Sequence, residues 1–495
     1  MIAAAAQQQV IGHRGAVSAA HPLAVDAGVA ILRAGGSAID AMVAAQAVLC
    51  VLAPEAGGIG GDALLLVNEP DGSVTAISGT GRWPIRADPD APCHDGGASV
   101  TVPGLVGAWA TANASYGRLS LKDCLAPAVE LADKGIQVTR ATAAAATQQR
   151  DRLVAGGAGE WTMAISAAGT VVQQPALAEV LRGLACDGPA ILSTGPFARA
   201  IADVVRRHGG ALTADDLAAH ETLVTEPIST SFGGGRLYVQ PSPTQGVLLA
   251  MSAEWLSNSS EREELEYSST WLDHVGIELT EAVFQYRSRV AEGTALLGQS
   301  LAIDPICAAR RGGPRAYLHT AGVATADADG QVVSSLMSVF DDFGSCVFVP
   351  ELGIVLNNRA GGFTSGPNRP QPGERPVHTL APALWRGRDE SVALATPGAD
   401  GQIQTLLQVL CRWLLLGEDL QPAIAAPRWR SEAEVLLIES DHPNFDSLTH
   451  RGHPTVARPR GDGVFGSVVA AAFNRRDGST RAWGDWRRDV SADAA

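Results

Sequence analysis

The stretch Thr320-Ala-Gly-Val-Ala-Thr-Ala-Asp-Ala-Asp-Gly-Gln-Val-Val-Ser-Ser-Leu-Met-Ser338 is the most informative part of the sequence, because it predicts a β-hairpin that carries a hydroxyl residue at each outer end. Its turn contains Asp329-Gly330, a pair that favours tight hairpin turns because glycine adopts positive φ without strain. Val323 and Thr325 lie before this turn and Val333 lies after it, at the spacing of strands. The sequence therefore predicts strand, turn and strand.

Thr320 stands where an N-terminal nucleophile could be released by a backbone cut. If the chain is cut between His319 and Thr320, the new α-amine lies beside the threonine hydroxyl, so nucleophile and base share one residue. An α-amine has a pKa of roughly 8, which leaves part of it neutral and able to accept a proton near pH 7. On spacing alone a threonine at a strand start is more often a surface hydroxyl, so the hypothesis needs support from the rest of the chain.

That support comes from short motifs that run in constant order along nearly the whole chain. They resemble motifs of the γ-glutamyltranspeptidase family and lie at residues 16–28, 32–41, 57–62, 102–104, 125–128, 343–345, 356–358, 375–376, 426–428 and 484–489. The resemblance implies an α+β fold, the four-layer αββα sandwich of N-terminal nucleophile hydrolases. It also implies two autoproteolytic fragments that form this unit jointly, a large fragment 1–319 and a small fragment 320–495 that begins with Thr320.

The resemblance carries the catalytic roles to four residues. Thr320 matches the processing and nucleophile position, and Ser338 matches a second hydroxyl that hydrogen-bonds the nucleophile; a plain strand serine is the alternative. Gly398 and Ala399 match the pair of backbone donors that stabilises an oxyanion, in a loop before an amphipathic helix at 403–414. The family usually has glycine at position 399, so the donor survives only if the loop does not require positive φ there. An ordinary turn is the alternative for this loop.

Substrate recognition departs from the family pattern. Arg82 matches the arginine that clamps a substrate carboxylate, a role suited to a planar bidentate donor, although a surface arginine at a strand edge is the alternative. Phe340, Arg359 and Gly362 stand where the family holds the α-ammonium group of a γ-glutamyl donor with amide and acidic side chains. A buried ammonium without a counter-charge is unfavourable, so glutathione-type donors are expected to bind poorly.

Three further positions of the same pocket follow from the resemblance. Asn358 belongs to the matching Asn-Asn motif, and His378 and Thr379 stand at two family serines. His378 can donate to a substrate oxygen or be a structural loop histidine, and both readings remain open. With Arg82 and Arg359 expected in one pocket, a compact substrate bearing a carboxylate and an electrophilic carbonyl is favoured.

The resulting prediction is a self-processing N-terminal threonine hydrolase that acts on a small carboxylate-bearing acyl or amide substrate through an acyl-enzyme. Three alternatives stay open. The first is γ-glutamyl transfer or hydrolysis. The second is hydrolysis of a carbon–carbon bond next to a carbonyl, as in a branch of the family found in antibiotic alkylproline pathways. The third is an unprocessed pseudoenzyme that serves as a binding protein.

Composition narrows the partners. The 495 residues carry a formal net charge of −15, which disfavours nucleic acid and anionic membranes, whose binding rests on Lys and Arg. The first nine residues lack a positive region and a sustained apolar run, so a cytoplasmic enzyme is expected. Seven scattered cysteines form no CxxC pair, and neither a metal nor a cofactor is expected. The expected partners are the small anionic substrate and the two fragments, paired as a heterodimer or within a higher oligomer.

Two local patterns near the N-terminus help to place the motifs. A helix is predicted over 21–34, and Ser37 with Asp40 predicts a capping box for a second helix that runs to about residue 52. Gly57-Gly-Ile-Gly-Gly61 resembles a phosphate-binding loop only loosely, because it is not GxGxxG and an apolar strand at 63–67 follows it. Close backbone packing near the site is the favoured interpretation.

Overall fold

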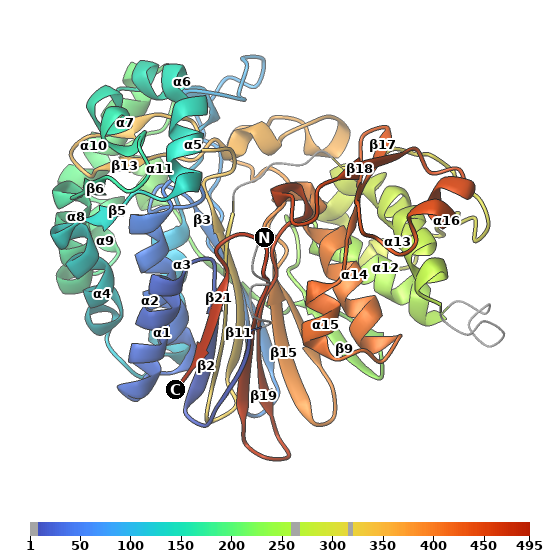
Figure 1. Cartoon of the computed structure of the whole chain (residues 1–495). Coiled ribbons are helices and arrows are strands. Elements are labelled where there is room, and N and C mark those ends of the chain that lie inside the picture. The colour runs from blue at the N-terminus through green and yellow to red at the C-terminus, as the bar shows by residue number, and fades with distance from the viewer. Residues whose placement is uncertain (1–7, 259–267, 315–319) are drawn as a thin grey trace.

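Two seven-stranded sheets stack face to face between two layers of helices (Figure 1). The structure is a computed structural model that describes residues 8–258, 268–314 and 320–495. All neighbouring strands of these two sheets pair antiparallel. The predicted αββα sandwich is confirmed.

The first sheet has the strand order β1-β20-β19-β15-β14-β9-β8, and the second has the order β21-β2-β10-β11-β3-β4-β7. The first comprises β1 Gln8–Gly12, β20 Thr480–Gly484, β19 Val469–Asn474, β15 Glu390–Ala395, β14 Ala383–Arg386, β9 Gly235–Val239 and β8 Ile228–Phe232. The second comprises β21 Ser491–Ala494, β2 Gly15–Ala19, β10 Ala321–Asp327, β11 Val332–Ser338, β3 Asp62–Asn68, β4 Val74–Ser78 and β7 Leu223–Thr225.

Three apolar layers hold the sandwich together. Between the sheets the side chains are mostly alanine, such as Ala324, Ala393 and Ala471, which lets the sheets approach closely. Larger aliphatic side chains lie on the outer faces. The second sheet is covered by α1 Pro22–Arg33, α2 Ala38–Leu52, α3 Leu105–Tyr116, α4 Leu121–Lys134 and α8 Pro175–Asp187. The first sheet is covered by α12 Gly246–Asn258, α13 Ser269–Phe284, α14 Gln402–Leu414 and α15 Leu420–Ala425.

Shorter elements connect and flank these layers. The helical ones are η1 Gly97–Ser99, α5 Arg140–Gln148, α6 Arg150–Ala155, α7 Gly159–Ile165, α9 Ala190–Ser193, α10 Gly195–Arg207, α11 Ala214–Ala218, η3 Arg287–Leu296, η4 Arg359–Gly362, η5 Gly366–Asn368, η6 Ala399–Gly401, α16 Phe445–His450 and η7 Gly463–Phe465. The remaining strands are β5 Ile136–Gln137, β6 Val171–Val172, β12 Phe348–Val349, β13 Ile354–Val355, β16 Trp429–Glu432, β17 Val435–Glu439 and β18 Thr455–Arg458. No helix of the described part of the chain is long and apolar enough to cross a membrane.

The local predictions near the N-terminus hold. The helix predicted at 21–34 is α1, and the capping box before α2 is present: Ser37 Oγ accepts the Asp40 N–H at 3.2 Å, and the Asp40 carboxylate accepts the Ser37 N–H at 2.9 Å. A side chain at Gly60 or Gly61 would collide with the carbonyl oxygen of Val355 or Ser338. These glycines therefore allow close backbone packing, as the sequence predicts.

Each of the two sheets contains strands from both sides of residue 320 (Figure 1). β10 pairs with β2 on one side and β11 pairs with β3 on the other, while β1 pairs with β20 in the first sheet. The predicted boundary at 319/320 thus runs through one shared core and does not separate two domains.

Candidate active site

The hairpin β10–β11 brings two of the predicted catalytic residues together. Its ladder pairs Ala321 with Met337, so one further step places Thr320 opposite Ser338. Residues directly opposite in antiparallel strands have Cβ atoms roughly 4.5–5.5 Å apart. Thr320 is 7% exposed and Ser338 is 2% exposed. His319, the other half of the predicted cleavage site, lies outside the described residues.

The predicted oxyanion loop lies at the same end of the sandwich. A Cβ added at Gly322 would lie 3.7 Å from the Ala395 Cβ, so the start of β10 faces the end of β15. The loop with Gly398 and Ala399 follows β15 directly and leads through η6 into the 13-residue helix α14. Neither N–H donates to a backbone carbonyl of the described residues. Both donors are therefore available at the helix start.

One condition of the sequence prediction fails in this loop. Ala399 has φ 48°, so the loop does require positive φ at that position. A residue with a Cβ in this left-handed region is strained by roughly 1–2 kcal/mol relative to the right-handed one. Alanine thus keeps the backbone donor, but in a conformation that favours glycine.

The backbone after Ser338 turns sharply into the site. Ser338 Oγ accepts the Phe340 N–H at 2.9 Å, and Phe340 has φ 88°. The Phe340 ring lies against the Arg359 guanidinium, with Cζ 4.6 Å from the ring centroid. The serine hydroxyl therefore fixes the turn that sets the aromatic ring.

Asp62, Arg359 and His378 form a fully buried polar cluster. Arg359 Nε donates to Asp62 Oδ2 at 2.9 Å, and His378 Nε2 lies 3.1 Å from the same oxygen. Burial would raise the pKa of Asp62, but the hydrogen bond from His378 and the charge of Arg359 outweigh it and hold this pKa below its ordinary value. The Arg359 Nη1 and Nη2 atoms have no hydrogen-bond acceptor among the described residues.

Both ring nitrogens of His378 form hydrogen bonds to other groups of the protein. Its Nδ1 accepts the Leu380 N–H at 3.1 Å, so Nε2 carries the proton that is donated to Asp62. Burial, followed by the charge of Arg359, lowers the pKa of His378 to about 4, which leaves the ring neutral at pH 7. Of the two readings that the sequence left open, this arrangement favours a structural histidine.

Asn358 and Thr379 support neighbouring loops. Asn358 Nδ2 donates to Asp341 Oδ2 at 2.7 Å and its Oδ1 accepts the Asp341 N–H at 3.1 Å. The Thr379 carbonyl accepts a hydrogen bond from Gln245 Nε2, which also donates to the Ala399 carbonyl at 2.9 Å. Gln245 thus joins the 379 loop to the oxyanion loop.

Arg82 does not meet Arg359 in the way that the sequence predicts. Its side chain is exposed, and its Nη1 donates to the Gly373 carbonyl at 2.8 Å. Arg359 is completely buried, and neither arginine lines the large cavity beside the site. Arg359 turns inward to Asp62 while Arg82 lies at the surface, and a shared role of the two in substrate binding stays a prediction.

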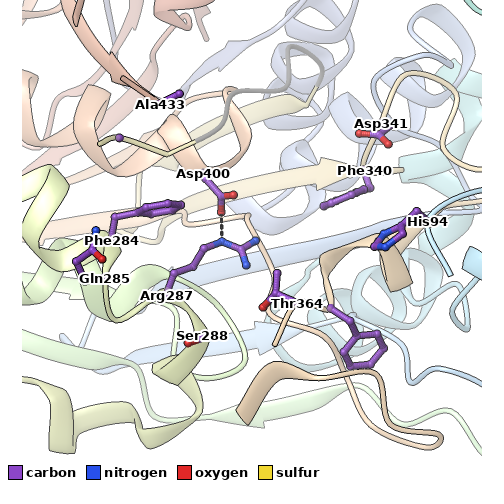
Figure 2. Close-up of a pocket in the computed structure, with 13 residues that line it drawn as sticks. His94, Phe284, Gln285, Arg287, Ser288, Phe340, Asp341, Thr364, Asp400 and Ala433 are labelled. Atoms are coloured by element: carbon purple, nitrogen blue, oxygen red, sulfur yellow. Dashed lines mark hydrogen bonds and ion pairs between the residues drawn. The ribbon is translucent and has the colours of Figure 1, made fainter. Parts of the chain in front are cut away.

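A cavity of about 780 Å³ opens beside these elements (Figure 2). Phe340 and Asp341, just after Ser338, line it, as does Asp400, next to Ala399. The remaining lining residues are His94, Phe284, Gln285, Arg287, Ser288, Gly313, Gly361, Phe363, Thr364 and Ala433. Thr320 is not among them; Phe340 lies two residues after Ser338, and Asp400 directly follows Ala399.

Sequence reasoning missed three charged residues of this cavity. Arg287 Nε donates to Asp400 Oδ1 at 2.7 Å, and Asp341 faces the cavity from the turn after Ser338. Burial raises the pKa of Asp341, although the hydrogen bond from Asn358 opposes this change. Asp400 and Asp341 could have been noticed because each adjoins a predicted site residue, whereas Arg287 gives no such signal.

Comparisons with known proteins agree with this architecture. Residues 24–301 and 308–495 match the profile of the family described as gamma-glutamyltranspeptidase. An oxamate amidohydrolase proenzyme of Klebsiella pneumoniae is 32% identical over 453 residues, covering 85% of each chain. A glutathione hydrolase-like proenzyme of Bacillus subtilis is 31% identical and covers 98% of this chain and 99% of its own.

A solved structure extends the agreement to the fold. The crystal structure of cephalosporin acylase from Bacillus halodurans superposes with a TM-score of 0.86 at 26% identity, over 100% of this chain and 98% of that one. The profile, the relatives and the four-layer sandwich lead to one conclusion. The chain belongs to the γ-glutamyltranspeptidase family and is an enzyme of the N-terminal nucleophile hydrolase type.

Proposed function

We propose that the chain cuts itself between His319 and Thr320 and then uses Thr320 to hydrolyse an acyl or amide bond of a carboxylate-bearing substrate. The observation that supports this most is the grouping of Thr320, Ser338 and the Gly398–Ala399 loop at one end of the sandwich. A buried hydroxyl pair beside two available backbone donors is the arrangement that acyl transfer requires.

Self-processing and turnover use the same groups. Thr320 Oγ attacks the carbonyl carbon of residue 319, the peptide nitrogen leaves as the new α-amine, and water hydrolyses the resulting ester. In turnover the α-amine takes the Thr320 hydroxyl proton while Oγ attacks the substrate carbonyl and forms an acyl-enzyme. The amine then protonates the leaving nitrogen, and water releases the acid. The N–H groups of Gly398 and Ala399 stabilise the oxyanion, each contributing about 3 kcal/mol to lowering the barrier.

The fragments 1–319 and 320–495 would stay together as a heterodimer. Both sheets contain strands of both fragments, and the relatives named above are proenzymes. Processing therefore changes one bond and leaves the shared core intact.

The buried guanidinium group of Arg359 supports the recognition of a substrate carboxylate. Arg359 is fully buried behind Phe340, which lines the cavity, so its guanidinium acts on a bound anion through its charge and not by direct contact. Phe340 and Gly362 supply no acceptor for an ammonium group. These features favour an acyl group without an α-amine, as in the relative named for oxamate.

One observation favours γ-glutamyl hydrolysis as a second candidate. Asp341 lines the cavity, and its Oδ1 has no hydrogen-bond partner among the described residues. This oxygen could accept a substrate ammonium in place of the family groups that are missing. Two chromogenic anilides that differ only in that ammonium, glutaryl-p-nitroanilide and γ-glutamyl-p-nitroanilide, separate the two candidates.

The test of processing uses gel electrophoresis and mass spectrometry of the purified chain. We expect two fragments, the smaller beginning at Thr320, and a single intact band for Thr320→Ala. Faster release from the glutaryl anilide supports the main proposal, and faster release from the γ-glutamyl anilide supports the second candidate. An intact wild-type chain, or a processed and active Thr320→Ala chain, would contradict the use of Thr320.

A further inference from the structure

Arg287 is the single lysine or arginine among the thirteen residues that line the large cavity (Figure 2). It begins η3, three residues after the end of α13, and is therefore held by a long helix that packs against α12 and α14. Its side chain is only 12% exposed. A guanidinium that is largely buried yet lines a cavity is placed to meet a ligand inside that cavity.

Asp400 fixes the orientation of this guanidinium. The carboxylate accepts from Nε at 2.7 Å, which uses one edge of the planar group. No described residue accepts a hydrogen bond from Nη1 or Nη2 of Arg287. Figure 2 shows these outer nitrogens turned away from Asp400, toward the side of the cavity where Thr364 and Phe340 lie. The outer edge of an arginine so held matches the two oxygens of a carboxylate.

Asp400 is the ion-pair partner of Arg287. The Asp400 carboxylate also acts electrostatically on Arg430 and Arg359, whose main counter-charges are Glu432 and Asp62. Asp400 directly follows Ala399, which links Arg287 through one ion pair to the oxyanion loop. A carboxylate bound at Arg287 would thus lie in the cavity that Asp400 lines beside the oxyanion loop.

The cavity also indicates the size of the substrate. Its volume of about 780 Å³ lies within the range of roughly 300–1,000 Å³ found for drug-sized ligands. Phe284, Phe340 and Phe363 supply aromatic wall around the charged centre. A two-carbon oxo acid would leave most of this space empty.

Building on the proposed function, we infer that Arg287 is a specificity-determining residue that binds a substrate carboxylate remote from the scissile bond. The substrate class is an acyl compound whose chain separates this carboxylate from the reacting carbonyl. Arg82 and Arg359 do not fill this role, because one lies exposed outside the cavity and the other is buried behind Phe340.

The test measures binding of glutarate, with butyrate as the probe that lacks the second carboxylate. Isothermal titration calorimetry is run on the purified wild-type chain and on Arg287→Gln, Arg287→Lys and Arg289→Gln. Arg289 is a matched control because it belongs to the same η3 helix, pairs with Glu292 and does not line the cavity. We expect Arg287→Gln to raise the glutarate dissociation constant at least tenfold, Arg287→Lys to raise it less, and Arg289→Gln to leave it unchanged. Wild type should bind butyrate at least tenfold more weakly than glutarate.

Equal binding of glutarate by wild type and Arg287→Gln would overturn the inference, as would no binding by wild type or an equal loss in Arg289→Gln. If Arg287→Gln does not fold, as judged by circular dichroism, Arg287→Lys carries the test because it keeps the charge but loses the planar fork. Gel electrophoresis of the same samples reports processing at Thr320 separately. A failure of the proposed function therefore shows as one band, and a failure of the carboxylate site shows as unchanged affinity.

Discussion

Replacing Asp62 by asparagine should destabilise the protein strongly, because it removes the counter-charge of a buried arginine. Asp62, Arg359 and His378 are each 0% exposed, and Asp62 Oδ2 is 2.9 Å from Arg359 Nε. Removing one partner of a buried ion pair typically lowers the free energy of unfolding by about 3–5 kcal/mol. For a chain of 495 residues the unfolding entropy is about 1 kcal/mol per kelvin, so the melting temperature should fall by roughly 3–5 °C.

Differential scanning calorimetry at pH 7 and a fixed scan rate measures this shift. Asp133→Asn is the matched control, because Asp133 pairs with Arg182 where both side chains are 41% and 51% exposed. Such surface pairs contribute at most about 1 kcal/mol, so the control should change by no more than about 1 °C. Adding Arg359→Met to Asp62→Asn should recover part of the loss by removing the unpaired charge. A melting temperature for Asp62→Asn within about 1 °C of the control would show that Asp62 does not stabilise Arg359 as a buried counter-charge.

Three further predictions concern the same site. Chemical denaturation should show that Ala399→Gly raises the free energy of unfolding by about 0.5–1 kcal/mol. The relief of strain at φ 48° exceeds the conformational entropy that glycine loses on folding. A destabilised variant would contradict this. Because the pKa of His378 is lowered from 6.5 to about 4, the unfolded chain binds a proton in this window that the folded chain does not. The free energy of unfolding should therefore fall as the pH drops from 6.5 to 4, by roughly 3 kcal/mol for this residue, and equal unfolding curves at pH 7 and 4.5 would disprove it. Ser338→Ala should slow the appearance of two fragments on gels at least tenfold while Ser338→Thr keeps the wild-type rate, and equal rates for both variants would remove Ser338 from processing.

The sequence predicts those parts of the fold that depend on local rules. Asp329-Gly330 predicts the turn between β10 and β11, and Gly330 indeed has φ 97°. The capping box of Ser37 and Asp40 places the start of α2 correctly. Residues 396–401 predict a loop before a helix, which is η6 followed by α14. In each case neighbours within a few positions determine the backbone.

The parts that sequence reasoning missed depend on contacts between distant residues. Asp62 and Arg359 are 297 positions apart, so the direction in which Arg359 points could not be read from its neighbours. Arg287 and Asp400 are 113 positions apart, and only the folded chain shows that they share a cavity. Arg82 matches a family motif, yet its exposure depends on how the loop with Gly373 packs against it.

Because both sheets contain strands from residues 8–314 and from residues 320–495, the two halves of the molecule cannot be separated without breaking both sheets. β10 is bonded to β2, β11 is bonded to β3, and β1 is bonded to β20. Neither residues 8–314 nor residues 320–495 form a complete sheet on their own. Dilution after a break at residue 320 would therefore not yield two stable monomers. Dissociation would require global unfolding, and two separately expressed polypeptides would have to fold around each other to rebuild the sandwich.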